Sequence, residues 1–316
     1  MSAGQPRFTV GSAPHWRRNS SLFRMNHAFI LALVPMAVLG AIVHAFGWRN
    51  VQLDGAFGPI NPMLSTAVNE MGVDSGALWL LGIFGTLALG MGTAVIVEYV
   101  SQIIFRQPYQ ATNGHGLLMG LLVVLLSPPS IPWWVLIVGV TVAIVLGKQL
   151  FGGIGSFPMH PAMVGWLIVL LSWPHHLYPV GSASIGAPHP AVVGLTALGG
   201  IALCLTGYIR WQIPLGVLIG VALSFFAFSG SLSGDFLHQF TTGHVVLAAF
   251  FIATDSTTSP ANRLAAFLSG LLTGVMIMLI RAYGIWPDAV PFAILLVNLL
   301  SPHLDRIRPK MRSVVA

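Results

Sequence analysis

The sequence predicts an all-α polytopic membrane protein with about ten transmembrane segments in two inverted repeats. Three observations support this fold class. Hydrophobic residues make up 55% of the 316-residue chain and charged residues only 7%, whereas a soluble domain carries about 25% charged residues. The apolar residues gather into runs that suit membrane helices. A Gly-His dipeptide also opens a short apolar run twice, at Gly114-His115 and at Gly243-His244.

The composition excludes several classes of function. The mean hydropathy of +0.83 indicates a membrane protein, and the polar, basic first 23 residues hold no apolar stretch with a signal-peptide cleavage site. The isoelectric point near 10.1 does not indicate a nucleic-acid partner, because the 14 Lys and Arg residues flank the apolar runs. The one cysteine, Cys204, lies in an apolar run, which excludes disulfides, cysteine-ligated iron–sulfur clusters and c-type haem within this chain.

Ten apolar runs are the expected membrane segments. Six of them approach the ~20 residues that a spanning helix needs; these cover residues 27–47, 77–105, 131–147, 190–207, 213–229 and 262–280. Four shorter runs cover residues 117–126, 162–171, 245–253 and 289–300. About ten residues cross only about half of a ~30 Å hydrocarbon core. The short runs are therefore interrupted half-helices, or helices whose polar ends are buried in protein.

The repeated Gly-His motif divides a single membrane domain, residues 25–305, into two related blocks, 25–175 and 176–305. Each Gly-His run is followed by a longer segment, a loop broken by glycine or proline, and a second short run with Ser-Pro or a near-match at or close to its end. Two related membrane halves with interrupted helices usually place a working site where they meet. A packed repeat without a site is the simpler alternative.

The basic residues indicate the orientation. With ten crossings and a cytoplasmic N-terminus, every Lys and Arg except Arg49 and Arg281 falls on the cytoplasmic side, as the positive-inside rule requires. The basic N-terminal segment 1–24 and the basic tail 306–316 are then both cytoplasmic. The first Gly-His starts its run on the inner side and the second on the outer side, as an inverted repeat requires.

Glu98 is the first candidate for chemistry. It lies in the apolar run 77–105, about 10 Å from the inner end if the helix is regular. A carboxylate at that depth is costly unless it is paired, protonated or open to water. Glu98 is therefore either an ion- or proton-handling group or one partner of a structural ion pair with Arg or His.

Asp255 is the second candidate, because it follows a short apolar run and precedes a cluster of hydroxyl side chains, Ser256-Thr257-Thr258-Ser259. Hydroxyls and a carboxylate at a helix break suit a cation or a polar ligand. The alternative is helix capping, with Ser259 as the N-cap and Pro260 at the first helical position. Capping does not account for the carboxylate.

A glycine-rich loop and two histidines complete the candidates. Glycines in the run that ends at His160 let the backbone approach a ring or phosphate closely, although such a loop is more often a turn. His115 and His244 occupy matching places in the two blocks. Facing histidines can ligate haem b, but both of these begin their segments, so hydrogen bonding at a helix start is the favoured role.

Four motifs resemble a known family, which contains the RnfD component of the RNF electron-transport complex and the NqrB component of the sodium-translocating NADH:quinone reductase. They are Leu146-Gly-Lys-Gln-Leu-Phe-Gly-Gly-Ile-Gly155, Pro161-Ala-Met-Val-Gly165, Phe251-Ile-Ala-Thr-Asp255-Ser-Thr-Thr-Ser-Pro260 and Arg281-Ala-Tyr-Gly284 with Pro287-Asp288. The resemblance covers about residues 25–305. It implies a ten-helix fold of two inverted repeats, related to the urea transporters, in a bacterial inner membrane.

The resemblance also implies a function. Members of the family pass electrons through flavins while moving Na⁺ or H⁺, as subunits of a complex with other membrane and peripheral subunits. They carry an acidic residue in the second span and another in the Ala-Thr-Asp motif, both implicated in ion transport. These match Glu98 and Asp255, which are therefore the expected ion-handling residues.

The implied cofactor is FMN, which the family attaches through a phosphoester to a threonine on the outer face; riboflavin is a second candidate. The corresponding loop, residues 179–188, has no threonine, so Ser184 is the candidate acceptor. A motif that has lost its acceptor is the alternative. The other cofactor-binding candidates are Gly152, Gly153, Gly155, His160 and Thr257, although Phe157 and His160 stand where relatives usually have asparagine.

Two other functions remain open: a flavin-free channel or transporter of small solutes, and a membrane platform that docks redox partners. The two carboxylates favour the redox role, and the missing threonine favours the others. The chain has no dinucleotide-binding fingerprint, so NADH, ferredoxin or quinone chemistry is expected on partner subunits.

Overall fold

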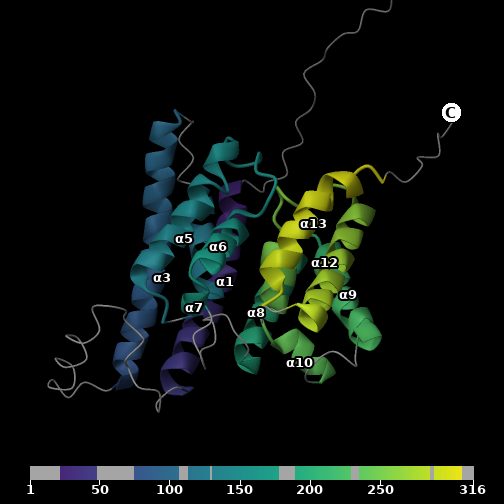
Figure 1. The fold of residues 1–316 in the computed structure, drawn as a ribbon, viewed down its shortest axis with the longest axis horizontal. Coiled ribbons are helices and arrows are strands. Elements are labelled where there is room, and N and C mark those ends of the chain that lie inside the picture. The colour runs from purple at the N-terminus through teal and green to yellow at the C-terminus, as the bar shows by residue number, and fades with distance from the viewer. Residues whose placement is uncertain are drawn as a thin grey trace, which may run out of the picture.

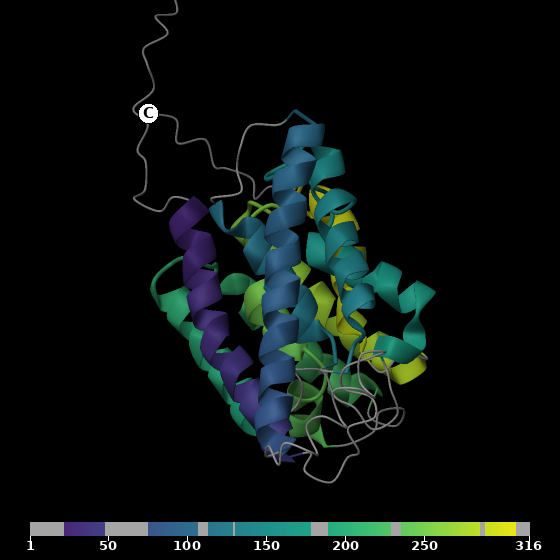
Figure 2. The same ribbon diagram turned by 90° about the vertical axis from the view of Figure 1, so that its left-hand side faces the viewer.

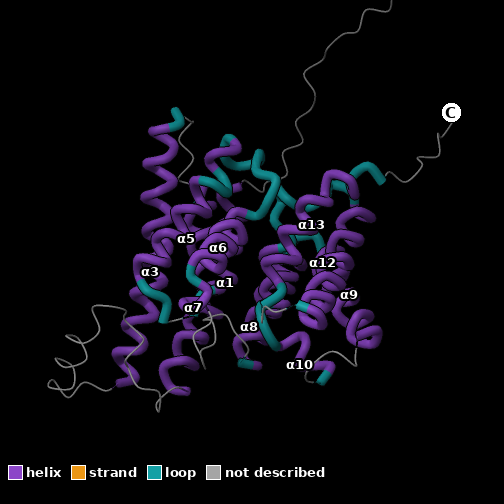
Figure 3. The backbone as a smooth tube through the Cα atoms, in the orientation of Figure 1, coloured by secondary structure: helices purple, strands orange, loops and turns teal. Residues whose placement is uncertain are grey.

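A computed structural model of the protein describes residues 22–47, 75–106, 113–128, 130–177, 189–228, 235–284 and 288–307. Within these ranges the chain is helical and has no strand (Figure 3). The predicted all-α class is confirmed. Four helical stretches are long and apolar enough to cross a membrane: Leu22–Val43, Leu80–Ile104, Trp133–Phe151 and Arg263–Tyr283.

The helices follow the predicted apolar runs along the chain. The first block contains α1 (Leu22–Gly47), α3 (Ser75–Ile104), α4 (His115–Leu126), α5 (Trp133–Val145), the 3₁₀ turn η4 (Gln149–Phe151), α6 (Pro161–Ser172) and α7 (Pro174–Leu177). The second contains α8 (Pro190–Leu205), α9 (Gln212–Phe228), α10 (Phe236–Thr241), α11 (Val245–Leu247), the π-helical turn η5 (Ala248–Ile252), α12 (Arg263–Tyr283) and α13 (Val290–Leu304).

Several helix lengths differ from the prediction. α5 has 13 residues, because the chain turns at Gly147, where the backbone packs against Pro161. α8 has 16 residues and is shorter than the predicted run 190–207, whereas α9 has 17 residues and keeps the predicted length. α13 has 15 residues and continues through Ser301-Pro302, which the sequence pattern placed at its end. Length alone therefore does not separate spanning helices from half-helices here, and the ten-segment count stays a prediction.

The helices pack in the same order in both blocks. In the first block α3 contacts α4 and α5, and α5 contacts α6. In the second, α9 contacts η5 and α12, and α12 contacts α13. The two groups lie side by side in Figure 1, joined by α1 against α8 and by α6 against α13.

The outer faces of the long helices are apolar. Figure 2 shows α3 running most of the height of the molecule beside α1. On α3, Ile96 is 64% exposed; on α8, Leu198 is also 64% exposed, and on α9 Phe226 is 71% exposed. Large apolar side chains exposed on several helices suit contact with lipid rather than water, which agrees with a multi-pass membrane protein.

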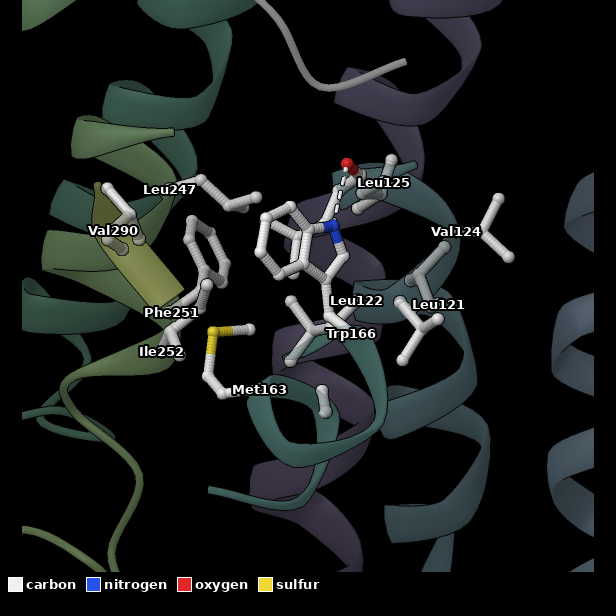
Figure 4. Close-up of a cluster of buried hydrophobic side chains, with 14 of the residues drawn as sticks. Leu121, Leu122, Val124, Leu125, Met163, Trp166, Leu247, Phe251, Ile252 and Val290 are labelled. Carbon is white, nitrogen blue, oxygen red and sulfur yellow. Dashed lines mark hydrogen bonds between the residues drawn. The ribbon is translucent and has the colours of Figure 1, made fainter. Parts of the chain in front are cut away.

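The short segments meet in the middle of the molecule. Figure 4 shows Leu122 and Leu125 of α4, Met163 and Trp166 of α6, and Phe251 of η5 in one buried cluster, together with side chains of α11 and α13. The Trp166 indole N–H donates to the backbone oxygen of Leu126 at 3.3 Å. Since a helix end buried in an apolar environment needs partners for its free carbonyl groups, this bond helps α4 to end inside the protein.

The predicted N-cap of α12 is wrong. Ser259 and Pro260 do not start the helix; Asn262 does, because its side-chain oxygen accepts from the backbone N–H of Leu264 at 3.1 Å. The Ser259 N–H instead donates to the backbone oxygen of Asp255 at 3.1 Å. Residues 255–260 are thus a separate turn before the helix, and Asp255 belongs to that turn.

Candidate functional site

Glu98 is buried in α3 and forms an ion pair with Lys148, which follows α5. The side chains are 1% and 0% exposed. Gln102, one turn further along α3, donates to the same carboxylate oxygen at 3.3 Å. Removing one charge from a buried pair leaves the other uncompensated, at a cost of about 3–5 kcal/mol. The pair therefore fixes α3 against the end of α5, and its two charges depend on each other.

Two buried histidines adjoin this ion pair. His115, the first residue of α4, is 4% exposed, and His160, just before α6, is 0% exposed. The charges of Lys148 and of His160 both act on the His115 ring. The Glu98 carboxylate lies against Gly116, where an added Cβ would stand 3.0 Å from the carboxylate carbon and overlap an oxygen. We call Glu98, Lys148, His115 and His160 the inner polar cluster.

The glycine-rich loop shapes this cluster through its backbone. Gly152, Gly153 and Gly155 have φ values of 103°, 94° and 94°, a region that residues with a Cβ rarely adopt. The Gly153 N–H donates to the backbone oxygen of Lys148 at 3.2 Å. These glycines are explained by the turn that returns the chain from Lys148 to α6. Of the predicted loop residues, only His160 places a side chain in the inner polar cluster.

A second charged cluster surrounds the second Gly-His. Asp288, just before α13, pairs with the ring Nδ1 of His244. Arg281, in the last turn of α12, donates to the backbone oxygens of Gln239 and Thr242, both at 2.7 Å. A hydrogen-bonding role at a helix start was the favoured expectation for both histidines, and it fits His244. His115 differs, since neither of its ring nitrogens has a hydrogen-bond partner among the described residues.

Both Gly-His motifs need their glycine. Gly114 and Gly243 have φ values of 69° and 60°. A Cβ at Gly114 would stand 2.9 Å from the His27 ring, and one at Gly243 would stand 2.8 Å from the Arg281 guanidinium. The repeat in the sequence therefore reflects the same left-handed turn, which brings the backbone close to a charged or titratable side chain in each half.

Asp255 lies in the turn after η5 and is half-buried. Its carboxylate accepts from the Thr258 hydroxyl at 3.2 Å and from the backbone N–H groups of residues 256, 257 and 258. Burial raises the pKa of Asp255 to about 6, and these hydrogen bonds act in the opposite direction. Thr257, predicted as a cofactor-binding residue, contributes a backbone N–H to this turn. Asp255 can therefore change protonation state close to neutral pH.

A narrow pocket opens beside this turn. Its polar lining consists of the side chains of Thr258, Ser259, Ser269, Thr273, Asn298 and Ser301. The free space is about that of one water molecule. The turn after η5 thus adjoins an opening lined by oxygen atoms, whereas the inner polar cluster contains buried imidazole nitrogens. The two predicted carboxylates lie in chemically different surroundings.

Comparison with known protein families identifies the family of this chain. A family model described as the NQR2, RnfD, RnfE family matches residues 9–182 and 180–313. The chain belongs to this family. Its relatives include an RnfD protein of Alcanivorax borkumensis, which is named as a component of an ion-translocating oxidoreductase complex. This relative is 31% identical over 275 residues, covering 67% of this chain and 80% of the relative.

Two further relatives in the NQR2, RnfD, RnfE family align over almost their full length. The protein of the same name from Methanosarcina acetivorans is 29% identical over 324 residues, covering 98% of each chain. A relative from Clostridium ljungdahlii is named as the corresponding component of a proton-translocating ferredoxin:NAD(+) oxidoreductase complex. It is 27% identical over 345 residues, covering 95% of this chain and 94% of the relative. The predicted family is confirmed.

Sequence reasoning missed three charged residues of the two clusters. Lys148 and Arg281 entered only through the charge count and the family motifs, and Asp288 only through a family motif. Lys148 could have been found from the sequence, because a deeply buried carboxylate needs a positively charged partner and Lys148 directly follows a neighbouring apolar run. Ser184 lies outside the described residues.

Proposed function

We propose that the chain is a membrane subunit of an ion-translocating electron-transport complex of the RNF type, in the bacterial inner membrane. Its partners are the other membrane and peripheral subunits of that complex. The observation that carries this proposal is the buried Glu98–Lys148 pair in a family whose named relatives are ion-translocating. Intramembrane ionisable residues mark ion or proton pathways by default.

We infer that the ten segments form two inverted repeats with both termini in the cytoplasm. The matching packing order of α3–α6 and α9–α13 supports this arrangement. So do the equivalent left-handed turns at Gly114 and Gly243, each of which precedes a histidine at a helix start. In this arrangement the two ion-handling carboxylates belong to different repeats, because Glu98 lies in α3 and Asp255 lies in the turn after η5.

The described residues of the glycine-rich loop do not fit a buried flavin. Phe157, 2% exposed, packs on the His115 ring at 5.6 Å between centroids, and His160 is 0% exposed beside it. These side chains fill the inner side of the loop. We propose that any FMN is held instead at the outer loop, with the Ser184 hydroxyl as the phosphoester acceptor; when bound, the group would carry electrons.

In-gel fluorescence tests the FMN proposal. The denatured chain, viewed under ultraviolet light, is expected to give a fluorescent band that disappears in Ser184→Ala. The matched control is Ser182→Ala, two residues away in the same loop, which is expected to keep the band. A dark wild-type band, with no flavin released from the native protein, would favour a docking or transport role for this chain.

Ion transport in the intact complex tests the main proposal. In inverted membrane vesicles, electron transfer should drive ion uptake when the wild-type chain is present and not when its gene is deleted. Glu98→Gln should reduce uptake at least about tenfold, while Glu98→Asp, which retains a carboxylate, should retain more activity. Asp255→Asn should also reduce uptake, and it should remove any decline of uptake as the pH falls through about 6. Unchanged uptake in Glu98→Gln and Asp255→Asn would refute the assignment.

A further inference from the structure

The inner polar cluster holds two histidines that the ion pair does not explain. His115 and His160 are 4% and 0% exposed. Within the described part of the chain, neither ring nitrogen of either residue has a hydrogen-bond partner. Buried polar groups in native proteins are nearly always hydrogen-bonded, so a group without a partner calls for a specific explanation, such as bound water or a catalytic role. Packing alone would favour apolar side chains at these positions.

His115 lies where its charge acts on the ion pair, and His160 lies close enough to act on His115. The His115 ring interacts electrostatically with Lys148 and with His160. The Glu98 carboxylate contacts Gly116, the residue after His115. Phe157 packs on the His115 ring. A positive charge on the His115 imidazole would therefore repel the Lys148 ammonium group, which is the partner of the Glu98 carboxylate.

A third histidine connects this cluster to the protein surface. His27, on α1, is exposed, and its Nδ1 lies 2.7 Å from the backbone oxygen of Phe23, so Nδ1 carries a proton and Nε2 is available for a second. Its ring lies against Gly114, the residue before His115. The Asn26 side chain donates to the backbone oxygen of Asn113 at 2.9 Å and holds α1 to this turn. Titratable groups thus extend from exposed His27 to buried Glu98.

The unpartnered ring nitrogens of His115 and His160 determine which kind of ligand this site can bind. Alkali cations are hard ions that prefer oxygen ligands, whereas the unpartnered atoms here are imidazole nitrogens, which bind protons or transition metals. Within the described ranges there is no group of three or more His, Cys, Asp or Glu side chains placed to hold a metal ion. Imidazole nitrogens of this kind bind a proton rather than an alkali cation, and a bridging water would supply the hydrogen-bond partner that each ring nitrogen lacks.

We propose that His115 and His160, together with the Glu98–Lys148 pair, form a proton-binding centre that is loaded from the cytoplasmic side through His27. The inference rests on the proposed function and specifies its ion as a proton. Each uptake adds one proton from water to a neutral imidazole nitrogen and raises the charge of the cluster by one; each release reverses this, and no bond to carbon changes. The titratable groups that contacts place at the cluster are His27, His115, Lys148, His160 and Glu98.

The test compares proton and sodium transport in vesicles that contain the intact complex. Wild-type electron transfer should acidify the lumen in sodium-free buffer, and a protonophore should abolish the pH gradient. His160→Asn and His115→Gln, which each replace the imidazole with a neutral amide side chain, should each lower proton transport at least about tenfold. His27→Gln should slow it several-fold. The control His303→Gln, at an exposed histidine of α13, should transport protons like wild type.

A second readout separates a site defect from a folding defect. Infrared difference spectra of the purified complex after a pH jump should contain imidazole protonation bands, and these should weaken in His160→Asn while partner subunits still co-purify. Protonophore-resistant sodium uptake, with the histidine variants fully active, would overturn the proton-binding centre and leave the proposed function standing. A complex that moves neither ion would instead overturn the proposed function.

Discussion

At the scale of single residues, the Glu98–Lys148 pair is the strongest energetic constraint in the first block. Each charge is stable in the protein interior only because the other is present. We therefore expect Glu98→Gln and Lys148→Met each to lower the free energy of unfolding by about 3–5 kcal/mol. The double variant should lose less than the sum of the two, with a coupling of about 1–3 kcal/mol.

Unfolding of the purified chain in mixed detergent micelles measures these changes. The four proteins of the cycle are compared at one pH and one detergent composition. If the effects of the two single variants are additive, or if each is below about 0.5 kcal/mol, the charges do not depend on each other. The inner polar cluster would then be open to water.

The sequence predicted Glu98 and Asp255 as special residues because an isolated carboxylate in or next to an apolar run is conspicuous. It did not predict their partners. Lys148 pairs with Glu98 across 50 positions of sequence, and no local pattern encodes such a contact. The two unpartnered histidines were equally hidden, since only the folded packing shows which ring nitrogens lack a hydrogen bond.

At the scale of elements, hydrophobic runs predicted the long membrane-associated helices but not their ends. The start of α12 shows the reason. Ser259-Pro260 has the composition of a helix start, yet the Asn262 side chain makes the capping bond. The π-helical turn η5 was also not predicted; there the Ala253 N–H donates to the backbone oxygen of Ala248, five residues earlier. Both features depend on the tertiary contacts of the turn after η5.

The left-handed turn before each histidine gives a prediction at this scale. Gly243→Ala should lower the free energy of unfolding by about 1–2 kcal/mol, because a Cβ is disfavoured at φ 60°, and more if Arg281 cannot move. Gly85→Ala is the matched control. Gly85 lies within α3, and a Cβ there would meet nothing within 4 Å, so alanine should be neutral or stabilising by about 0.4–1 kcal/mol.

The same micelle unfolding measurement serves for both glycine variants. Equal effects at Gly243 and Gly85 would mean that the second Gly-His does not need its left-handed turn. A destabilised Gly243→Ala protein should also hold the His244–Asp288 pair less firmly, because His244 directly follows the turn.

At the scale of the whole molecule, the inverted arrangement of the two repeats determines which loops face the cytoplasm. The basic residues indicate that orientation, and the structure contributes the matching helix contacts of the two blocks. Residues 48–74, between α1 and α3, lie outside the described ranges and do not enter this argument. Two exposed positions beyond the opposite ends of α9 provide the sharpest check.

Trp211 lies just before α9 and Leu237 lies in α10, which follows α9; they are 58% and 73% exposed. In a Cys204→Ala background, which removes the one native cysteine, we expect Trp211→Cys to react with a membrane-impermeant thiol reagent only from the cytoplasmic side. Leu237→Cys should react only from the opposite side, because one spanning segment separates the two positions. Labelling of intact cells and of inverted vesicles measures both. Reaction of both cysteines from the same side would mean that α9 does not cross the membrane. Every later segment would then have the opposite orientation. The His244–Asp288 pair would lie at the same membrane face as the Glu98–Lys148 pair.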